Sequence, residues 1–362
     1  MELSAPLREA DERMALILSR FRLAEHLNPI NAAEARAGWK GGAGAPRLLY
    51  EPVTWGDEAL HALDQVRAPG DHPLGEAVNR IAEEFRAFVV ALRDRTEAAF
   101  DALARIHAWY PEPIDAPTRI EPNGASTRPA AVSATGMMEV LQRALDARGM
   151  VGWSTRLDAR LASRVLVDAP RREVRINPRA TFRPADAVSL VAHEIDVHVR
   201  RSVNGGAQSL AMFATGLPGS LATEEGLAVA AEERVGVSTR HLLDRQALVA
   251  SAVLLARHTG FADVHTMLAE RVGPEAAWVI TVRVKRGLAA PDAPGVFAKD
   301  AVYHIGYHAV QAWLAGGGCL ASLYVGKVGL HHPVSAWISA GWVVPQPVPA
   351  LWALSPPGSG CA

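Results

Sequence analysis

The sequence has little cysteine, little lysine and no long apolar run. Its two cysteines, Cys319 and Cys361, are too few for the disulfide framework of a small secreted protein, so a reducing compartment fits best. The longest apolar run, at about residues 247–256, is too short to span a bilayer, and the charged first thirteen residues lack the apolar centre of a signal peptide. We therefore expect a cytoplasmic protein with no membrane partner.

The charge balance narrows the class of partner. A formal net charge of −1 over 362 residues gives no broad attraction to nucleic acid, so we expect no nucleic-acid partner. A chain of this length can bury one large hydrophobic core or two smaller ones. Function must therefore be inferred from local motifs.

The first third of the chain is predicted to be helical. Apolar residues at helical spacing predict helices over residues 7–27 and 74–109, and the Pro-rich residues 110–131 predict a linker or long loop. The apolar stripe of the second helix comprises Ile81, Phe85, Val89, Leu92, Ala99 and Leu103. We expect residues 1–130 to form an N-terminal helical region, followed by a further helix over residues 133–148.

The middle of the chain contains short β-rich pieces. Residues 153–158, 163–168 and 173–177 are β-branched or alternating, and residues 168–172 suit a turn. These pieces predict a small antiparallel sheet, whose edge strand could pair with an extended peptide. Residues 184–316 are almost wholly helical in pattern, so the predicted fold class is mainly α (α+β).

The motif most suggestive of chemistry is His193-Glu194-x-x-x-His198. The common zinc-peptidase motif, His-Glu-x-x-His, places both histidines on one face of an α-helix. Histidines five residues apart diverge by about 140° in a regular α-helix. One metal can hold both only if the helix widens into a π-bulge or breaks at His198. The alternative is that the two histidines are unrelated core or surface residues.

The residues around this motif predict that it lies on a helix. Thr181 is a candidate cap, Pro184 suits a first turn, and Asp186 is a favourable negative charge near the N-terminus. Apolar residues recur at helical spacing at Val188, Val191, Ile195 and Val199. We expect a mostly buried helix with the histidines near its inner face.

A stable metal site with an open position for water needs a third protein ligand. Glu224 and Glu225 begin a predicted helix whose next residues are small and apolar. A carboxylate in apolar surroundings needs a counter-charge, which a zinc ion would supply. The alternative is that both carboxylates only favour a helix N-terminus.

Further blocks occur in a fixed order along the chain. They are His193-Glu194-Ile195-x-x-His198 with Asn204-Gly205; Gly216-Leu217-Pro218 with Glu225-Gly226-Leu227-Ala228; and Arg283-Val284-x-Arg286-Gly287 with Phe297-x-Lys299-Asp300-x-x-Tyr303 and Gly326-Lys327. In order and spacing these blocks resemble the tubulin tyrosine carboxypeptidases and their bacterial relatives, the flavohaemoglobin expression-modulating QEGLA-motif proteins. The resemblance covers about residues 7–355.

The resemblance implies a zinc-dependent metallopeptidase whose zincin-like catalytic domain would occupy residues 131–362. His193, His198 and Glu225 would bind Zn²⁺, and Glu194 would be the general base that activates water. The implied reaction removes a C-terminal residue, aromatic or tyrosine-like, from a peptide or protein tail. The alternative is a non-enzymatic, metal-stabilised protein that binds peptides or regulates a partner.

The resemblance also suggests residues that contact the substrate. Tyr303 is the candidate donor to the developing oxyanion. Arg283, Arg286 and Lys299 are candidates for pairing with the terminal carboxylate, although ordinary ion pairs with Asp292 or Asp300 would explain any one of them equally well. Asn204, from the first block, is assigned to substrate binding with them.

The chain departs from the family pattern at two places. The family commonly has Gly-Thr where this chain has Asp196-Val197, and Gln where it has Glu224. Loss of the glycine would stiffen the bulge, and the added carboxylate would alter the charge near the metal. His304 and His308 are four residues apart, and we expect them to line a pocket or pack, because three ligands are already assigned.

Overall fold

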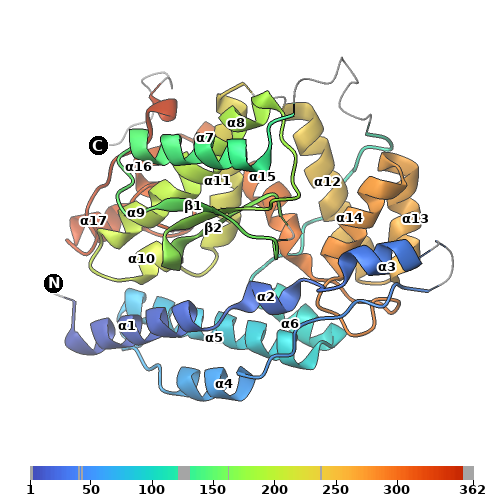
Figure 1. Cartoon of the computed structure of the whole chain (residues 1–362). Helices are drawn as coiled ribbons and strands as arrows, with labels where there is room; N and C mark the ends of the chain where they lie inside the picture. Colours follow the sequence, from blue (N-terminus) through green and yellow to red (C-terminus); the bar gives the residue numbers. More distant parts are fainter. Residues whose placement is uncertain are drawn as a thin grey trace.

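The computed structural model describes residues 3–39, 41, 44–120, 131–161, 163–236 and 239–353. It is mainly helical, as predicted, with one small sheet (Figure 1). The N-terminal helices are α1 (Ala5–Arg20), α2 (Leu23–Leu27), α3 (Ala32–Gly38), α4 (Gly56–Asp64), α5 (Pro73–Asp94) and α6 (Glu97–Ile106). Figure 1 shows most of them as a layer along one side of the molecule, with the sheet and the later helices on the other.

The remaining elements follow from residue 134. They are α7 (Ala134–Ala147), β1 (Ser154–Leu157), β2 (Val165–Asp168), η1 (Ala169–Arg171), β3 (Glu173–Ile176), α8 (Pro184–Leu190), η2 (Val191–Val199), α9 (Arg200–Gly206), α10 (Met212–Thr215), α11 (Ser220–Arg234), α12 (Thr239–Ala256), α13 (Phe261–Val272), α14 (Pro274–Lys285), η3 (Ala298–Ala301), α15 (Val302–Ala315), α16 (Leu320–Leu323), α17 (Val334–Ser339) and η4 (Ala350–Trp352). Within the described ranges, no helix is both long and apolar enough to cross a membrane.

The long helix expected over residues 74–109 is two helices, so that prediction was wrong in its continuity. Arg95 has a φ of 53°, in the left-handed region, and ends α5. Thr96 then caps α6 by accepting a hydrogen bond from the backbone N–H of Ala99. A left-handed residue followed by a threonine cap turns the chain, because neither residue continues the hydrogen-bond pattern of the preceding helix.

The three predicted strands form one sheet in the order β1–β3–β2. β2 pairs antiparallel with β3, but β1 pairs parallel with β3, so the prediction of a purely antiparallel sheet was wrong. The reason is that β1 does not form a hairpin with the next strand in sequence. Instead β3 inserts between β1 and β2 and must run antiparallel to β2, from which a tight turn separates it. β2 is therefore an edge strand.

The segment that leads into the histidine motif begins at a different cap from the one predicted. The N-cap of α8 is Arg183 rather than Thr181, and its backbone N–H donates to the carboxylate of Asp186. Pro184 occupies the first turn, as expected. Val188, expected on the buried stripe, is 51% exposed, whereas Ile195 and Val199 are fully buried. The apolar residues move to a different face of the helix because the α-helix gives way to a π-helix after Leu190.

The N-terminal helices pack against the later ones through one continuous core. Leu7 and Phe85 belong to the same buried cluster as Phe213 and Tyr324. The carboxylate of Asp11 in α1 also accepts hydrogen bonds from the backbone N–H groups that begin α10. The N-terminal helices are therefore fixed in place and can form a wall of any cleft that opens beside the sheet.

Candidate active site

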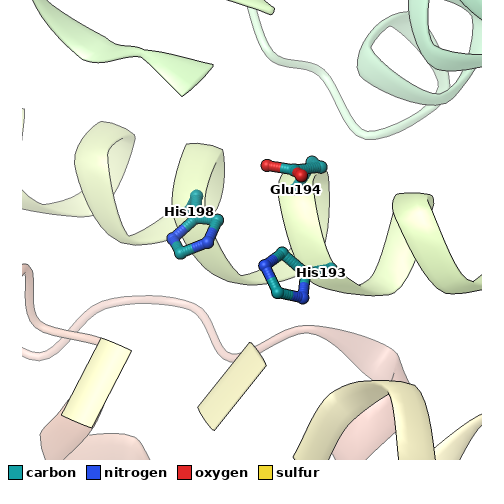
Figure 2. A group of neighbouring side chains, drawn as sticks. All are labelled: His193, Glu194 and His198. Carbon is teal, nitrogen blue, oxygen red and sulfur yellow. The ribbon is translucent and has the colours of Figure 1, made fainter. Parts of the chain in front are cut away.

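The segment that carries His193 and His198 is a π-helix, Val191–Val199, which is one of the two arrangements that the five-residue spacing allowed for a shared metal. In a π-helix the backbone bonds run from i to i+5, so residues five apart lie one turn apart on the same face. The two imidazole rings accordingly lie 4.9 Å apart between centroids. Figure 2 shows them adjacent along one side of the helix, with the Glu194 carboxylate on a neighbouring side.

Glu225, from α11, meets the two histidines at one point. Its Oε2 atom lies 3.7 Å from Nε2 of His193 and 3.5 Å from Nε2 of His198. Ligand atoms about 2.1 Å from a tetrahedral zinc ion lie about 3.4 Å apart, so these separations fit three ligands of one metal. Oε2 is also buried and has no hydrogen-bond partner among the described residues. An orphaned buried carboxylate oxygen beside two imidazole nitrogens fits a cation between them.

The far sides of both rings are held by carboxylates. Nδ1 of His193 lies 2.7 Å from Oε1 of Glu232, and Nδ1 of His198 lies 2.7 Å from Oε1 of Glu224. The hydroxyl of Ser189 donates to the second oxygen of Glu232. Such contacts fix the ring orientation and leave Nε2 for the metal, as in many histidine–metal sites.

The sequence analysis missed Glu232, although a signal for it existed. Glu232 follows Glu225 by seven residues, which is about two turns of an α-helix. Both side chains therefore lie on the face of α11 that packs against the π-helix. A search for acidic residues on the same face as the third candidate ligand would have found it.

The electrostatics of the cluster favour bound positive charge. Burial opposes protonation of His198, but the Glu225 and Glu224 carboxylates outweigh it and raise its pKa to about 10. Burial raises the pKa of Glu194, whose side chain is enclosed near both histidines. The described cluster thus gathers more carboxylates than imidazoles in a buried space, and such a group requires added cations.

Glu224, one of the two departures from the family pattern, is neutralised by two cations. Lys327 Nζ lies 3.0 Å from its Oε1, and Nη1 of the fully buried Arg201 lies 3.6 Å from its Oε2. These cations hold the pKa of Glu224 well below its usual range, although burial opposes this. The extra carboxylate therefore supports His198 without leaving an unpaired charge.

Asp196, the other departure, points away from the candidate metal position. Both of its oxygens pair with Arg148, which follows α7, and Nη2 of that arginine lies 2.9 Å from Oδ2. The bidentate pair attaches the π-helix to the end of α7. Asp196 thus contributes to the placement of the helix rather than to the ligand set.

A close crossing of α11 and α15 brings the third candidate ligand to the cleft. A Cβ atom added at Gly226 would lie 2.1 Å from the carbonyl carbon of Gly306, which leaves no room for any side chain. Glu225 immediately precedes the first glycine, and Tyr303 lies one turn before the second. Tyr303 lines the same cleft as Glu225. Burial, and to a smaller extent the charge of Glu225, raises the pKa of the Tyr303 hydroxyl.

The cleft has a volume of about 580 Å³ and contains the histidine motif in its wall. The sheet contributes β2, through Val165, Leu166 and Val167. The N-terminal helices contribute an opposite wall that sequence reasoning did not assign to the site. That wall includes Ile81, Glu84, Phe85 and Phe88 from α5, followed by His107 and Trp109.

The three predicted carboxylate-binding cations line the cleft but differ in availability. Arg283 forms a bidentate pair with Asp300, at 2.7 and 3.0 Å, so two donors of its guanidinium are already used. Arg286 donates weakly, at 3.3 Å, to Asp300 and to Asn28. Lys299 forms no ion pair with any residue that the structure describes. Of the three, Lys299 has the freest charge.

Two other predicted groups lie outside the centre. Asn204 is 2% exposed, and its amide donates to the backbone carbonyls of Tyr324 and Pro347, so the geometry gives it a structural role and not the expected contact with substrate. His304 and His308 pack against each other on α15 with centroids 4.5 Å apart. Neither belongs to the cluster around His193 and His198, in which Glu194 also has a carboxylate oxygen within 4.8 Å of both rings' nitrogens.

Most of the chain is similar to one known protein family. The sequence model of the family described as "Microtubule-associated tyrosine carboxypeptidase" matches residues 58–345. Microtubule-associated tyrosine carboxypeptidase 1 of Mus musculus is 34% identical over 119 residues, which are 32% of this chain and 25% of the mouse protein. The alignment thus spans about a quarter of that relative. The family match includes both histidines, Glu225 and the N-terminal wall of the cleft.

Proposed function

The chain belongs to the microtubule-associated tyrosine carboxypeptidase family, and on this premise we propose that it is a zinc-dependent carboxypeptidase. It would remove a C-terminal residue, aromatic and tyrosine-like, from a peptide or protein tail. The observation that carries the proposal is that the orphaned Oε2 of Glu225 lies within 3.7 Å of Nε2 of both His193 and His198. Such a donor set with an open side is typical of catalytic zinc.

Each residue of the centre has a role in this proposal. His193, His198 and Glu225 would hold zinc, which when bound supplies Lewis-acid activation of water and of the scissile carbonyl. Glu194 would accept the proton of the attacking water and pass it to the leaving amine. The buried Tyr303 hydroxyl, which stays protonated because its pKa is raised, would donate to the developing oxyanion.

The rest of the cleft suits a chain end. Lys299, assisted by Arg286, would pair with the terminal carboxylate, and an ammonium without another ion pair serves that purpose best. The edge strand β2 offers unpaired backbone groups that would hold the preceding residues in an extended form. Together these contacts would favour removal of one residue over cleavage within a chain.

Two measurements test the proposal. Elemental analysis of the purified protein should find one zinc per chain, and E225Q should lose it. The zinc-loaded protein should shorten peptides by one C-terminal residue, and E194Q should retain zinc and abolish this shortening. Full activity of E194Q would exclude the proposed base. A protein that retains peptides without shortening them would instead be a binding protein.

A further inference from the structure

Helix α15 carries a second pair of neighbouring histidines. His304 and His308 are four residues apart on this α-helix, slightly more than one turn, so both side chains lie on the same face. Their rings are 4.5 Å apart between centroids, with the planes at 67°. The rings of His193 and His198 are 4.9 Å apart, with the planes at 66°. The second pair therefore has nearly the same ring geometry as the two candidate metal ligands.

Each histidine pair has the spacing that its own helix requires. Residues five apart share a face in a π-helix, and residues four apart share a face in an α-helix. Two histidines four apart on an α-helix are also the arrangement with which the common zinc peptidases hold their metal. Spacing alone does not make a site, so the state of the ring nitrogens decides whether α15 can bind an ion.

The ring nitrogens of the second pair are unused. Within the part of the chain that the structure describes, neither His304 nor His308 forms a hydrogen bond or an ion pair. By contrast, Nδ1 of His193 and Nδ1 of His198 each contact a carboxylate. His308 is exposed and His304 is half-buried, so an ion from solvent can reach the pair. Burial lowers the pKa of His304 to about 4, so its ring is neutral at pH 7, as a metal ligand must be.

The neighbouring residue Tyr307 supports the pair. Its ring packs edge to face on the ring of His308, with centroids 5.4 Å apart. Its hydroxyl donates to Oε2 of Glu233 on α11, which also accepts a hydrogen bond from Gln311. The phenol is thus fixed, and the His308 ring would lose this packing if it rotated away from His304. A pair that is held together before an ion arrives loses less side-chain entropy when it binds.

We propose that His304 and His308 form a second, exchangeable site for a divalent transition-metal ion such as Zn²⁺, Ni²⁺ or Cu²⁺. Imidazole nitrogens suit these ions, whereas Mg²⁺ and Ca²⁺ prefer oxygen ligands and should not bind. With only two protein ligands the ion would keep water in its other positions, so it should bind more weakly than an ion held by three. Among the described residues, the cleft lining includes Tyr303 but neither of these histidines. The site therefore lies outside the cleft, and the inference does not depend on the proposed function.

The test titrates Ni²⁺ into the full-length, zinc-loaded protein and follows binding by calorimetry. We expect one Ni²⁺ to bind in addition to the zinc, and H308A should weaken this binding by about tenfold or more, because a single imidazole loses the advantage of two linked ligands. H308A/A309H is the spacing control, since it keeps two histidines on α15 but separates them by five residues, which diverge by about 140° in an α-helix. It should bind as weakly as H308A. H258A removes an exposed histidine elsewhere and should bind Ni²⁺ like the wild type.

Metal analysis separates this site from the centre in the cleft. After the titration, H308A should keep its zinc and lack only the added Ni²⁺. If the purified protein holds no zinc at all, Ni²⁺ should fill two positions in the wild type and one in H308A, so the proposed function can fail while this inference stands. Absence of the extra Ni²⁺ in the wild type, equal affinity in H308A, wild-type affinity in H308A/A309H, or equal binding of Mg²⁺ overturns the inference.

Discussion

Gly226 on α11 and Gly306 on α15 cross so closely that a Cβ atom on either glycine would overlap the backbone of the other helix. The contact matters because each glycine lies near a residue of the candidate centre. Glu225 precedes the first, and Tyr303 lies one turn before the second. The distance between a candidate ligand and a candidate oxyanion donor is therefore set by two residues that have no side chain.

G226A should separate these two helices. A Cβ atom 2.1 Å from the Gly306 carbonyl carbon requires a backbone shift, so we expect a loss of about 3 kcal/mol in the free energy of unfolding and weaker zinc binding. Urea unfolding and zinc content measure the two effects. G206A is the control, since no atom lies within 4 Å of the added Cβ at that helical glycine. Equal unfolding midpoints for the two variants would contradict the argument.

E232A should weaken zinc binding without removing a ligand. The variant leaves Nδ1 of His193 without its carboxylate, and loss of such a supporting contact typically costs tenfold to hundredfold in metal affinity. Competition with a chelator measures the affinity. Glu233, the adjacent residue, bonds Tyr307 and Gln311 instead of a histidine, so E233A should keep wild-type affinity. A similar loss in both variants would mean that the effect is general to α11.

K299M should affect substrates according to their terminal charge. We expect KM for a peptide with a free C-terminal carboxylate to rise tenfold or more, because the variant loses a charge-assisted hydrogen bond. The same peptide with a C-terminal amide should be cleaved slowly and equally by both proteins. If the variant instead impairs the acid and the amide by the same factor, Lys299 does not pair with the terminal carboxylate.

Removal of one partner of the Arg148–Asp196 ion pair should destabilise the protein more than removal of both partners. R148A leaves the Asp196 carboxylate, 9% exposed, without its partner, and should cost about 2 kcal/mol in the free energy of unfolding. The double variant R148A/D196A should be more stable than R148A alone, because it no longer buries an unpaired charge. Denaturant unfolding of the single and double variants decides this, and a double variant less stable than R148A would refute it.

Glu84 should make stability depend on pH. Burial raises its pKa from 4.5 to about 7, so the native state holds this proton more tightly than the unfolded state does. The native state therefore loses stability as the pH rises from about 4.5 through 7, by about 3 kcal/mol in total. E84Q cannot titrate, so its stability relative to wild type should increase by that amount between pH 4.5 and pH 8. E83Q retains Glu84, so urea unfolding should show that its stability falls over this pH range as that of the wild type does.

Local sequence signals predicted the parts of the fold that depend on nearby residues. The five-residue spacing of His193 and His198 left two arrangements by which one metal could hold both rings, a π-bulge or a break at His198, and the structure has the π-helix. Alternation and turn residues located all three strands within about two residues. The relative direction of β1 was not predictable in this way, because it depends on which strand lies beside it rather than on its own sequence.

The cleft wall could not be predicted from local signals either. Glu84 and Phe88 look like ordinary residues at the border of an amphipathic helix, and only the packing of α5 against the rest of the core turns them toward the histidines. Asn204 shows the opposite error. It adjoins the motif in sequence, but α9 directs its amide into the C-terminal loops, where backbone carbonyls satisfy it.

The π-helix that carries the two histidines also sets the orientation of α9, which follows it directly. A deletion of one residue between Ile195 and His198 would give the four-residue spacing of ordinary zinc peptidases and allow a regular α-helix. It would also rotate α9 by about 100° relative to the preceding turn. Arg201, whose guanidinium now holds the carbonyls of Leu323 and Gly326, would face elsewhere, and the loop that delivers Lys327 would lose its anchor. The extra residue thus fixes the rotation of α9 and, through Arg201, the position of the C-terminal loops. Shortening the five-residue spacing would therefore disrupt contacts throughout the C-terminal part of the chain.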